Sequence, residues 1–291
     1  MTTLPIVVGV DGSEPSLRAV DWAADEAVLR GAPLRLVYAS LWERYEGESL
    51  ADDLTKPSEQ VRAEDIVATA ARRAQLRAPD LKVTTDVLPE EPEYALVRES
   101  RDASLLVTGT RGRSGIAEAL LGSVSLIVAG HAHCPMIVLR GNHDNQTRFG
   151  THGRVVVGVG EKPAGSAAVR FAFEEARRRG VPVEALRAWR CPAHETTDHP
   201  LMSSEPARLH EQQAVEALRA ALQDAPADIE STSHTVEGHP RNALVNASHG
   251  ADLLVVGARR RPGHFGLQLG RVAHGVLHRS SCPVAVVPEP V

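Results

Sequence analysis

The feature that most constrains this chain is an internal repeat that covers both of its halves. Residues 6–10 (IVVGV) recur as residues 155–159 (VVVGV), an offset of 158 − 9 = 149. Residues 103–109 (ASLLVTG) recur as residues 251–257 (ADLLVVG), an offset of 257 − 109 = 148. A gap of one residue therefore aligns two segments of about 140 residues each, which is the usual size of one domain. The repeat predicts two domains of one fold joined in tandem.

The limits of the two domains follow from the segment between the copies. We expect the first domain at residues 1–140 and the second at residues 154–291. Residues 141–153 between them are polar, contain glycine and show no sustained hydrophobic periodicity, which is typical of a linker. The 291 residues are 43% hydrophobic, enough apolar material for a separate core in each domain.

Each copy alternates apolar runs with amphipathic stretches. In the first copy, β-branched apolar runs bounded by Gly or Pro predict strands at 5–10, 33–39, 81–88, 103–109 and 135–140. Runs this continuous indicate strands that are buried on both faces. A helix is expected to start near Ser13 and to stop at Gly31, and its counterpart to run from Gly165 to Gly180. This alternation predicts an α/β fold with an open, mostly parallel sheet covered by helices on both faces.

A glycine-containing loop follows the fourth predicted strand of the first copy. It has the pattern Gly-x2-Gly-x9-Gly-Ser, and its members with their neighbours are Gly109, Thr110, Arg111, Gly112, Arg113, Gly115, Gly122, Ser123 and Val124. Glycines let the backbone approach an anion closely, and the N-terminus of the helix that follows directs positive partial charge at it. The loop therefore suits a phosphate group, although a glycine-rich turn between strand and helix often serves only as a turn.

Asp11 strengthens the phosphate interpretation of this loop. It follows Gly9 and Val10 at the end of the first predicted strand, which lies beside the strand that leads into the loop in a parallel sheet. Its carboxylate is able to accept hydrogen bonds from a ribose or from an adenine amino group. The alternative is that Asp11 only caps the helix that opens near Glu14.

These segments together resemble the universal stress protein family. The resemblance rests on the strand that ends in GVDGS (9–13), on LLVTGTRG (105–112), on Gly122-Ser123 and on the final segment HAHCPMIVL (131–139). It covers nearly the whole chain, twice, as in the tandem-domain members of the family. It implies a five-stranded parallel sheet in each copy, flavodoxin-like or Rossmann-like, with ATP bound where the glycine pattern is kept and Mg carried on the phosphates.

The resemblance also implies roles for individual residues. Asp11 is expected to contact adenine or ribose, and Ala39 to contact adenine through its main chain. The phosphates are expected among the glycines of the loop, Ser123 and Val124. The full predicted ATP site comprises Gly9, Asp11, Ala39, Gly109, Thr110, Arg111, Gly112, Arg113, Gly115, Gly122, Ser123 and Val124. Neither a catalytic residue nor a metal site made by the protein alone is predicted.

The second copy departs from this pattern at three positions. Gly160 stands where the first copy has Asp11, Arg260 where it has Gly112, and Arg271 where it has Ser123. The loss of the carboxylate removes a polar partner, and Arg260 puts a bulky side chain where the backbone is expected to approach phosphate. We therefore expect ATP in the first copy and regard the second as degenerate. The run of arginines at 259–261 either attracts a different anion or is a solvated surface.

Charge and cysteine content exclude several partners and compartments. The 32 Lys and Arg residues and 37 Asp and Glu residues give a net charge of -5, so the chain has no overall basic field for nucleic acid or an anionic membrane. Three cysteines without a CxxC pair do not form a disulfide framework. The N-terminal segment lacks signal-peptide features, and no apolar run is long enough to span a membrane. These observations favour the cytoplasm.

The function predicted from these residues is that of an ATP-binding regulator in the stress response. Two alternatives stay open: a slow ATPase or nucleotidyl-transfer enzyme that uses the same loop, and an interaction module that binds no nucleotide. The last predicted strands, residues 135–140 and 283–288, are apolar edges that must be covered. We therefore expect the two domains to pair through them, and a homodimer is a further possibility.

Overall fold

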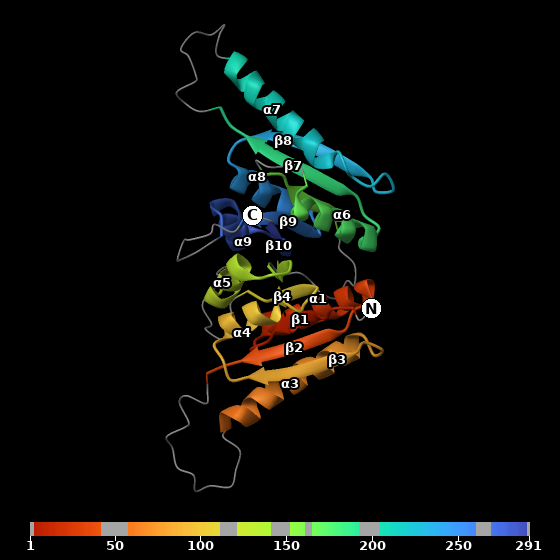
Figure 1. Cartoon of the computed structure of the whole chain (residues 1–291), viewed down its shortest axis with the longest axis vertical. Helices are drawn as coiled ribbons and strands as arrows, with labels where there is room; N and C mark the ends of the chain where they lie inside the picture. Colours follow the sequence, from red (N-terminus) through yellow and green to blue (C-terminus); the bar gives the residue numbers. More distant parts are fainter. Residues whose placement is uncertain are drawn as a thin grey trace. The chain divides into compact units, whose positions relative to one another are not determined.

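The computed structural model divides the chain into two compact units, one formed mainly by residues 1–148 and the other mainly by residues 149–291 (Figure 1). The structure describes residues 3–41, 58–110, 121–140, 152–160, 165–191, 204–259 and 269–289. None of the helices in these ranges is long and apolar enough to cross a membrane. The predicted linker at 141–153 and the predicted pairing of the last strands stay predictions.

The first unit is built on a parallel sheet. Its strands are β1 (Ile6–Gly9), β2 (Leu34–Ala39), β3 (Val83–Leu88), β4 (Leu105–Thr108) and β5 (Met136–Val138). They lie in the order β3-β2-β1-β4-β5, and each neighbouring pair is parallel. The order reverses between β1 and β4, because the chain first builds outward from β1 to β3 and then returns to the other side of β1. Ligands of such sheets bind at the carboxyl ends of the strands beside this reversal.

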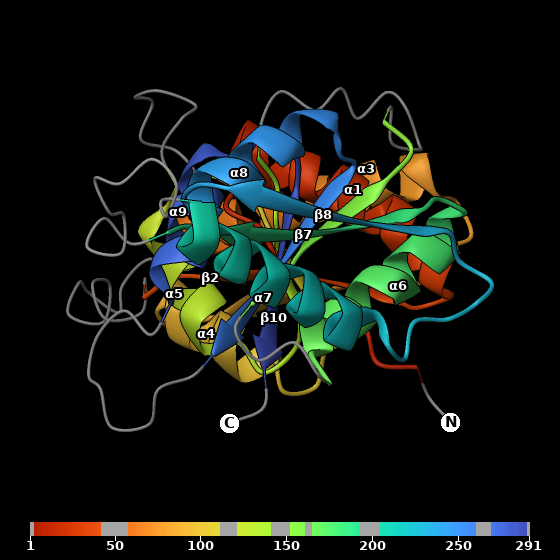
Figure 2. The same cartoon turned by 90° about the horizontal axis from the view of Figure 1, so that it is seen from above.

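Helices cover both faces of this sheet. They are α1 (Glu14–Arg30), α3 (Ser58–Arg77), α4 (Pro92–Glu99) and α5 (Ser123–His131). Helix α1 packs beside α3, and α4 packs beside α5, on the opposite face of the sheet (Figure 2). Helices on both faces explain why the central strands β1 and β4 are buried almost completely.

The second unit has the same topology. Its strands are β6 (Val155–Gly158), β7 (Val183–Trp189), β8 (Ser231–Glu237), β9 (Leu253–Arg259) and β10 (Val284–Glu289), in the order β8-β7-β6-β9-β10. Its helices are α6 (Ala167–Arg179), α7 (Ser204–Leu222), α8 (Pro240–Ala247) and α9 (Arg271–Arg279), with a short 3-10 helix, η1, at Ser248–Gly250. The prediction of two α/β domains with open parallel sheets is confirmed.

The helix limits predicted from caps also agree with the structure. Ser13 is the N-cap of α1, and Gly31 ends the helix in the left-handed conformation at φ 60°. Ser166 and Gly180 do the same for α6, with Gly180 at φ 65°. The ends of the two helices match at the repeat offset of 149, because Gly31 and Gly180 terminate them.

One expectation about the strands is wrong. None of the side chains of β3 is buried, and nearly every side chain of β8 is exposed. Both strands lie at an edge of their sheet as far as the described residues show, where covering by helices is incomplete. The apolar runs 5–10, 103–109 and 135–140 are also longer than β1, β4 and β5, since the hydrogen-bonded ladder ends before the apolar sequence does.

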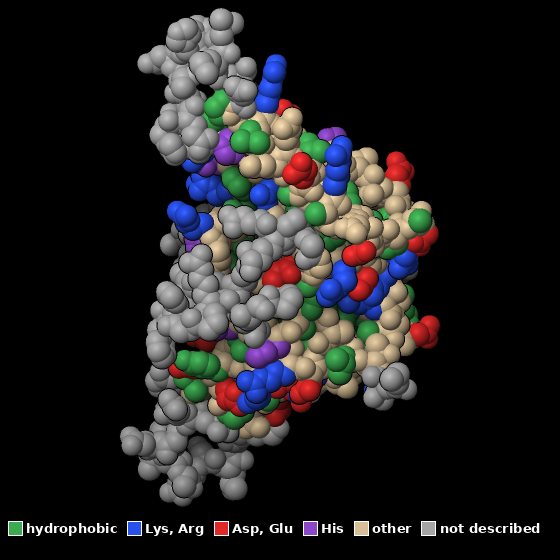
Figure 3. Space-filling model, turned by 45° about the horizontal axis from the view of Figure 1, so that its top comes forward, with side chains coloured by type: hydrophobic (Ala, Val, Ile, Leu, Met, Phe, Trp, Pro, Cys, Tyr) green, Lys and Arg blue, Asp and Glu red, His purple; other side chains and the backbone are tan. Residues whose placement is uncertain are grey.

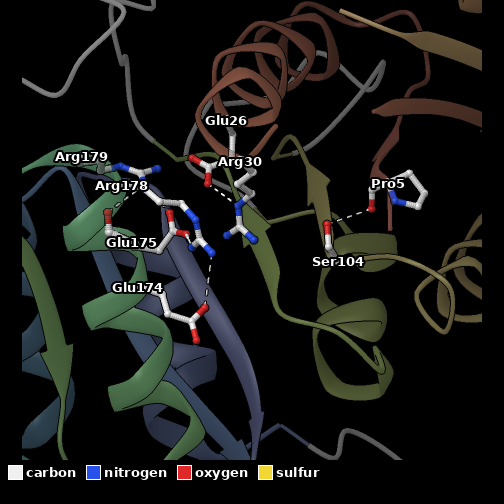
Figure 4. Close-up of polar contacts among 8 residues, drawn as sticks. All are labelled: Pro5, Glu26, Arg30, Ser104, Glu174, Glu175, Arg178 and Arg179. Carbon is white, nitrogen blue, oxygen red and sulfur yellow. Dashed lines mark hydrogen bonds and ion pairs between the residues drawn. The ribbon is translucent and has the colours of Figure 1, made fainter. Parts of the chain in front are cut away.

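Each unit also buries a carboxylate in the last turns of its first helix (Figure 4). Glu26 is 1% exposed and accepts a hydrogen bond from Arg30 Nε at 2.5 Å. Glu175 is 0% exposed and accepts hydrogen bonds from Arg178 Nη1 at 2.8 Å and from Arg179. A carboxylate this deep needs such partners, because an unpaired buried charge is strongly destabilising. Glu26 and Arg30 match Glu175 and Arg179 at the repeat offset of 149, so the two units bury this carboxylate at the same place.

Candidate functional site

The candidate site lies at the carboxyl ends of β1 and β4 in the first unit, where the strand order reverses. Three segments meet there: the turn after β1 that holds Asp11, the residues after β4 that begin with Gly109, and the start of α5. The first two segments directly follow the buried parallel strands β1 and β4, and the start of α5 is joined to the end of β4 by hydrogen bonds.

Asp11 is fixed by one of its two carboxylate oxygens. Asp11 Oδ1 accepts hydrogen bonds from Ser13 N at 2.9 Å and from Ser13 Oγ at 2.5 Å. The N-cap of α1 is Ser13, whose Oγ accepts from Ser16 N at 3.4 Å, so the alternative that Asp11 itself caps the helix is wrong. Asp11 instead orients the capping serine. Its second oxygen, Oδ2, accepts no hydrogen bond from any residue that the structure describes.

Gly109 has a packing role at this edge. A Cβ atom at this position would lie 2.5 Å from the carbonyl oxygen of Pro15 and 3.0 Å from the backbone N of Ser16. Only glycine therefore lets the first turn of α1 approach the end of β4 this closely. The glycine that opens the predicted phosphate loop is required by the fold, whether or not phosphate binds beside it.

The start of α5 is tied to the end of β4 through buried hydroxyl groups. Thr108 Oγ1 donates to Ser125 Oγ at 3.1 Å, and Ser125 Oγ donates to the carbonyl oxygen of Gly109 at 3.0 Å. The N-cap of α5 is Gly122, which has no side chain with which to cap the helix. The first-turn N–H groups, which belong to Ser123 and Val124 among others, thus carry the positive end of the helix dipole without a side-chain cap.

Two further residues of the predicted site, Ala39 and Gly9, lie at the same edge, where Ala39 is placed beside the Asp11 turn and Gly9 packs against α4. Ala39 is the last residue of β2, beyond the final β1–β2 hydrogen bond from Val10 N to the carbonyl oxygen of Val37. Its main chain therefore lies beside the turn that carries Asp11. Gly9 is explained by packing, because a Cβ atom there would lie 2.9 Å from a methyl carbon of Leu96 in α4.

Part of the predicted loop lies outside the described residues. Arg111, Gly112, Arg113 and Gly115 fall in the segment 111–120, and Arg260 of the second copy falls in the segment 260–268. Thr110 is described and half-buried, directly after Gly109. The contributions of the four loop residues stay predictions.

One residue at this edge was missed by the sequence reasoning. Arg140 follows β5 and is 6% exposed. Burial lowers the pKa of the Arg140 guanidinium, because a charged group is disfavoured away from water. The pattern that marks it is an arginine at the end of an apolar strand, at a position where the second copy has Pro288.

The second unit is built differently at the matched edge. Gly160 offers no carboxylate, and Val256 and Ala273 replace Thr108 and Ser125, so the hydroxyl link to the helix is lost. Gly270 is the N-cap of α9, with φ −62° and ψ 151°, close to the values of Gly122, φ −69° and ψ 149°. Arg271, the first residue of α9, is exposed. The helix start is thus conserved in shape while the groups around it change.

Two cysteines repeat near these edges without adding chemistry. Cys134 and Cys282 are both buried and free. Burial raises the pKa of each thiol to about 12. The thiolate that redox or metal chemistry requires is therefore scarce at neutral pH.

Surface charge agrees with the balance seen in the sequence. On the face drawn in Figure 3, Lys and Arg side chains are interspersed with Asp and Glu side chains over most of the described surface.

Comparison with known proteins assigns the family. The sequence model of the universal stress protein family matches the chain twice, at residues 3–140 and at residues 151–288. The chain belongs to the universal stress protein family. A universal stress protein of Mycobacterium tuberculosis (strain ATCC 25618 / H37Rv) is 32% identical over 305 residues, covering 99% of this chain and 97% of the relative.

Solved structures of universal stress proteins show the same fold. The crystal structure of one from Archaeoglobus fulgidus DSM 4304 matches with a TM-score of 0.66 at 18% identity, covering 98% of both chains. A universal stress protein in complex with cAMP is 30% identical and covers 48% of this chain and 98% of its own, with a TM-score of 0.37. The tandem organisation predicted from the repeat is thus shared with relatives of full length.

Proposed function

We propose that the first unit of this universal stress protein binds ATP and that the chain acts in the cytoplasm as a nucleotide-dependent regulator of the stress response. One observation carries the proposal. Asp11 Oδ2, which accepts no hydrogen bond from the described residues, and the start of α5, whose N-cap Gly122 has no capping side chain, meet at the reversal point of one sheet. An acceptor for a sugar or base and donors for an anion are thus available at the same edge.

The described residues fit the parts of a nucleotide. Asp11 Oδ2 is suited to accept from a ribose hydroxyl or the adenine amino group, while Oδ1 stays bonded to Ser13. The main chain of Ala39, at the end of β2, is suited to contact the base. The first-turn amides of Ser123 and Val124 are suited to the phosphates, together with the loop glycines. ATP would bring Mg on its phosphates and would supply the negative charge that the start of α5 attracts.

The arrangement favours binding over turnover. Near the described edge, the side chains of Ser13, Thr108 and Ser125 already take part in hydrogen bonds within the protein. These bonds position α1 and α5 and so preorganise the edge for a ligand. A regulator needs this preorganisation, whereas an ATPase also needs a group that activates water.

The test uses the full chain purified under mild conditions. Mass spectrometry of the released ligand is expected to find ATP, and calorimetric titration of the emptied chain is expected to favour ATP over GTP and cAMP. Phosphate release from ATP, followed over hours, is expected to stay close to the rate without protein. Absence of any nucleotide binding would contradict the proposal, and steady turnover would favour the enzymatic alternative.

A further inference from the structure

The second unit holds a carboxylate of its own at the start of α6. Glu289, the last residue of β10, accepts hydrogen bonds from Ser166 Oγ at 2.6 Å, from Ala167 N at 2.9 Å and from Ala168 N at 3.1 Å. These are the N-cap and the first two residues of the helix. The carboxylate therefore occupies the positive end of the α6 dipole, where an anion is favoured.

The same carboxylate lies against the first glycine of the degenerate loop. A Cβ atom on Gly257 would lie 2.8 Å from Glu289 Oε1 and 3.0 Å from Glu289 Cγ. Gly257 matches Gly109 at the repeat offset, and the missing Cβ of Gly109 faces the backbone of Pro15 and Ser16. The space that the first turn of α1 fills in the first unit is filled by a side chain of β10 in the second.

The lengths of the two helices explain this exchange. Helix α1 has 17 residues and α6 has 13, and both end at matched glycines. Helix α6 therefore starts about one turn later than α1 does. Ser13 Oγ donates to Asp11 in the first unit, and Ser166 Oγ donates to Glu289 in the second. Glu289 thus supplies a carboxylate at the start of α6, where Gly160 supplies none.

We propose that Glu289 is the residue that decides which unit accepts a nucleotide, because it holds a fixed negative charge at the edge where phosphates would enter the second unit. The inference rests on the proposed function for its ligand class, a nucleotide or polyphosphate. The first copy has Gly141 at the matched position and so carries no such charge. Glu289 is half-buried and its carboxylate is held in place by three hydrogen bonds, so its negative charge repels a polyphosphate that approaches this edge.

A purely structural role for Glu289 makes a different prediction. If it only caps α6, its removal should lower stability and leave anion binding unchanged. If it also excludes polyphosphate, its neutralisation should create an anion site that the parent chain lacks. The two roles are therefore separated by a binding measurement on variants whose folding is checked.

The experiment titrates full-length variants with tripolyphosphate. Gly122→Asp serves as the parent, because it is designed to silence the first unit. Glu289→Ala added to this parent is expected to gain one site per chain, with affinity at least about tenfold above that of the parent. Glu289→Gln keeps one acceptor oxygen, which is able to accept from Ser166 Oγ and Ala168 N, while its NH2 group cannot accept from Ala167 N. It is expected to gain a smaller part of this affinity. Glu237→Gln removes an exposed carboxylate at the end of β8 and is expected to change nothing.

The outcomes separate this inference from the proposed function. Equal titration curves for the parent and both folded Glu289 variants would overturn the inference. If only Glu289→Gln folds, the inference is decided by whether its affinity for tripolyphosphate exceeds that of the parent. Hydrogen exchange of the first-turn amides of α6 then checks that the helix is intact. Failure of the proposed function would appear elsewhere, as identical ATP binding by the wild-type chain and Gly122→Asp.

Discussion

The edges of the two units at the strand reversal solve one structural problem in two ways. In each unit a carboxylate accepts a hydrogen bond from the serine that caps the first helix. In the first unit Oδ1 of Asp11 accepts from Ser13 N and Ser13 Oγ, and Oδ2 accepts from no residue that the structure describes. In the second unit Glu289 lies at the end of β10, and both of its carboxylate oxygens accept hydrogen bonds from the start of α6. Asp11 therefore holds only the capping serine, whereas Glu289 holds the capping serine and two backbone amides of the helix.

The difference teaches that a lost motif residue is not always a lost interaction. Gly160 removes the carboxylate of the motif, yet the start of α6 still has one. What changes is the element that supplies the carboxylate: the turn after β1 in the first unit and the end of β10 in the second.

The largest expected effect comes from Gly122→Asp. A carboxylate at the N-cap of α5 would take the place of the phosphates, so ATP affinity should fall by at least about a hundredfold, or roughly 2.7 kcal/mol. The protein should stay folded, because φ −69° suits any residue and aspartate is a favoured N-cap. Calorimetry measures the loss. Gly270→Asp, at the matched N-cap of α9, is the control and should leave the tight ATP site unchanged.

Matched glycine substitutions compare the packing of the two edges. Gly109→Ala should lower the free energy of unfolding by about 1–3 kcal/mol, because the new methyl group meets backbone atoms of α1 that cannot move alone. Gly257→Ala should have a smaller effect, since its neighbour is the side chain of Glu289. Urea denaturation of the full chain measures both. Equal losses would show that the Glu289 carboxylate is held as rigidly as backbone.

The stoichiometry of binding tests the comparison directly. The full chain should bind about one ATP tightly, with any second site at least roughly tenfold weaker, a difference of about 1.4 kcal/mol. Equilibrium titration at a known concentration of active protein measures it. Two equivalent sites would show that the arginines of the second copy compensate for its altered loop and that its edge is not closed.

The smallest expected effect concerns Asp11. Asp11→Ala should weaken ATP several-fold more than it weakens tripolyphosphate, a difference of about 1 kcal/mol, because its expected partners are ribose and base. Parallel titrations with the two ligands measure the difference. Asp11→Asn is the control, because it removes the charge but keeps an oxygen that accepts from Ser13. A loss of affinity that appears in both variants is due to the charge, and a loss that appears only in Asp11→Ala is due to a loosened start of α1. Equal losses for both ligands would assign Asp11 to orienting the N-cap alone.

Local sequence patterns predicted much of this molecule because they report local forces. The spacing of apolar runs identified the strands, and Ser13 and Gly31 marked the ends of α1, since capping depends on residues within one turn. The edge strand β3 was predicted to be buried on both faces, because a run of residues does not reveal how completely helices cover it, and β8 in the second unit is exposed as well. The role of Gly9 was equally hidden, because its neighbour Leu96 lies far along the chain.

By itself the sequence determined that the chain holds two copies of one α/β domain and that the first copy keeps the glycine pattern. It also determined that the second copy has Gly160 and Arg271 at the positions that match Asp11 and Ser123. Repeats and substitutions of this kind are visible without coordinates. Only the tertiary structure decided that Gly109 is required by the backbone of Pro15, and that Glu289 reaches the start of α6 across 122 positions of sequence. The physical reason is that such contacts depend on where the sheet brings distant strand ends and helix starts together, which no local pattern encodes.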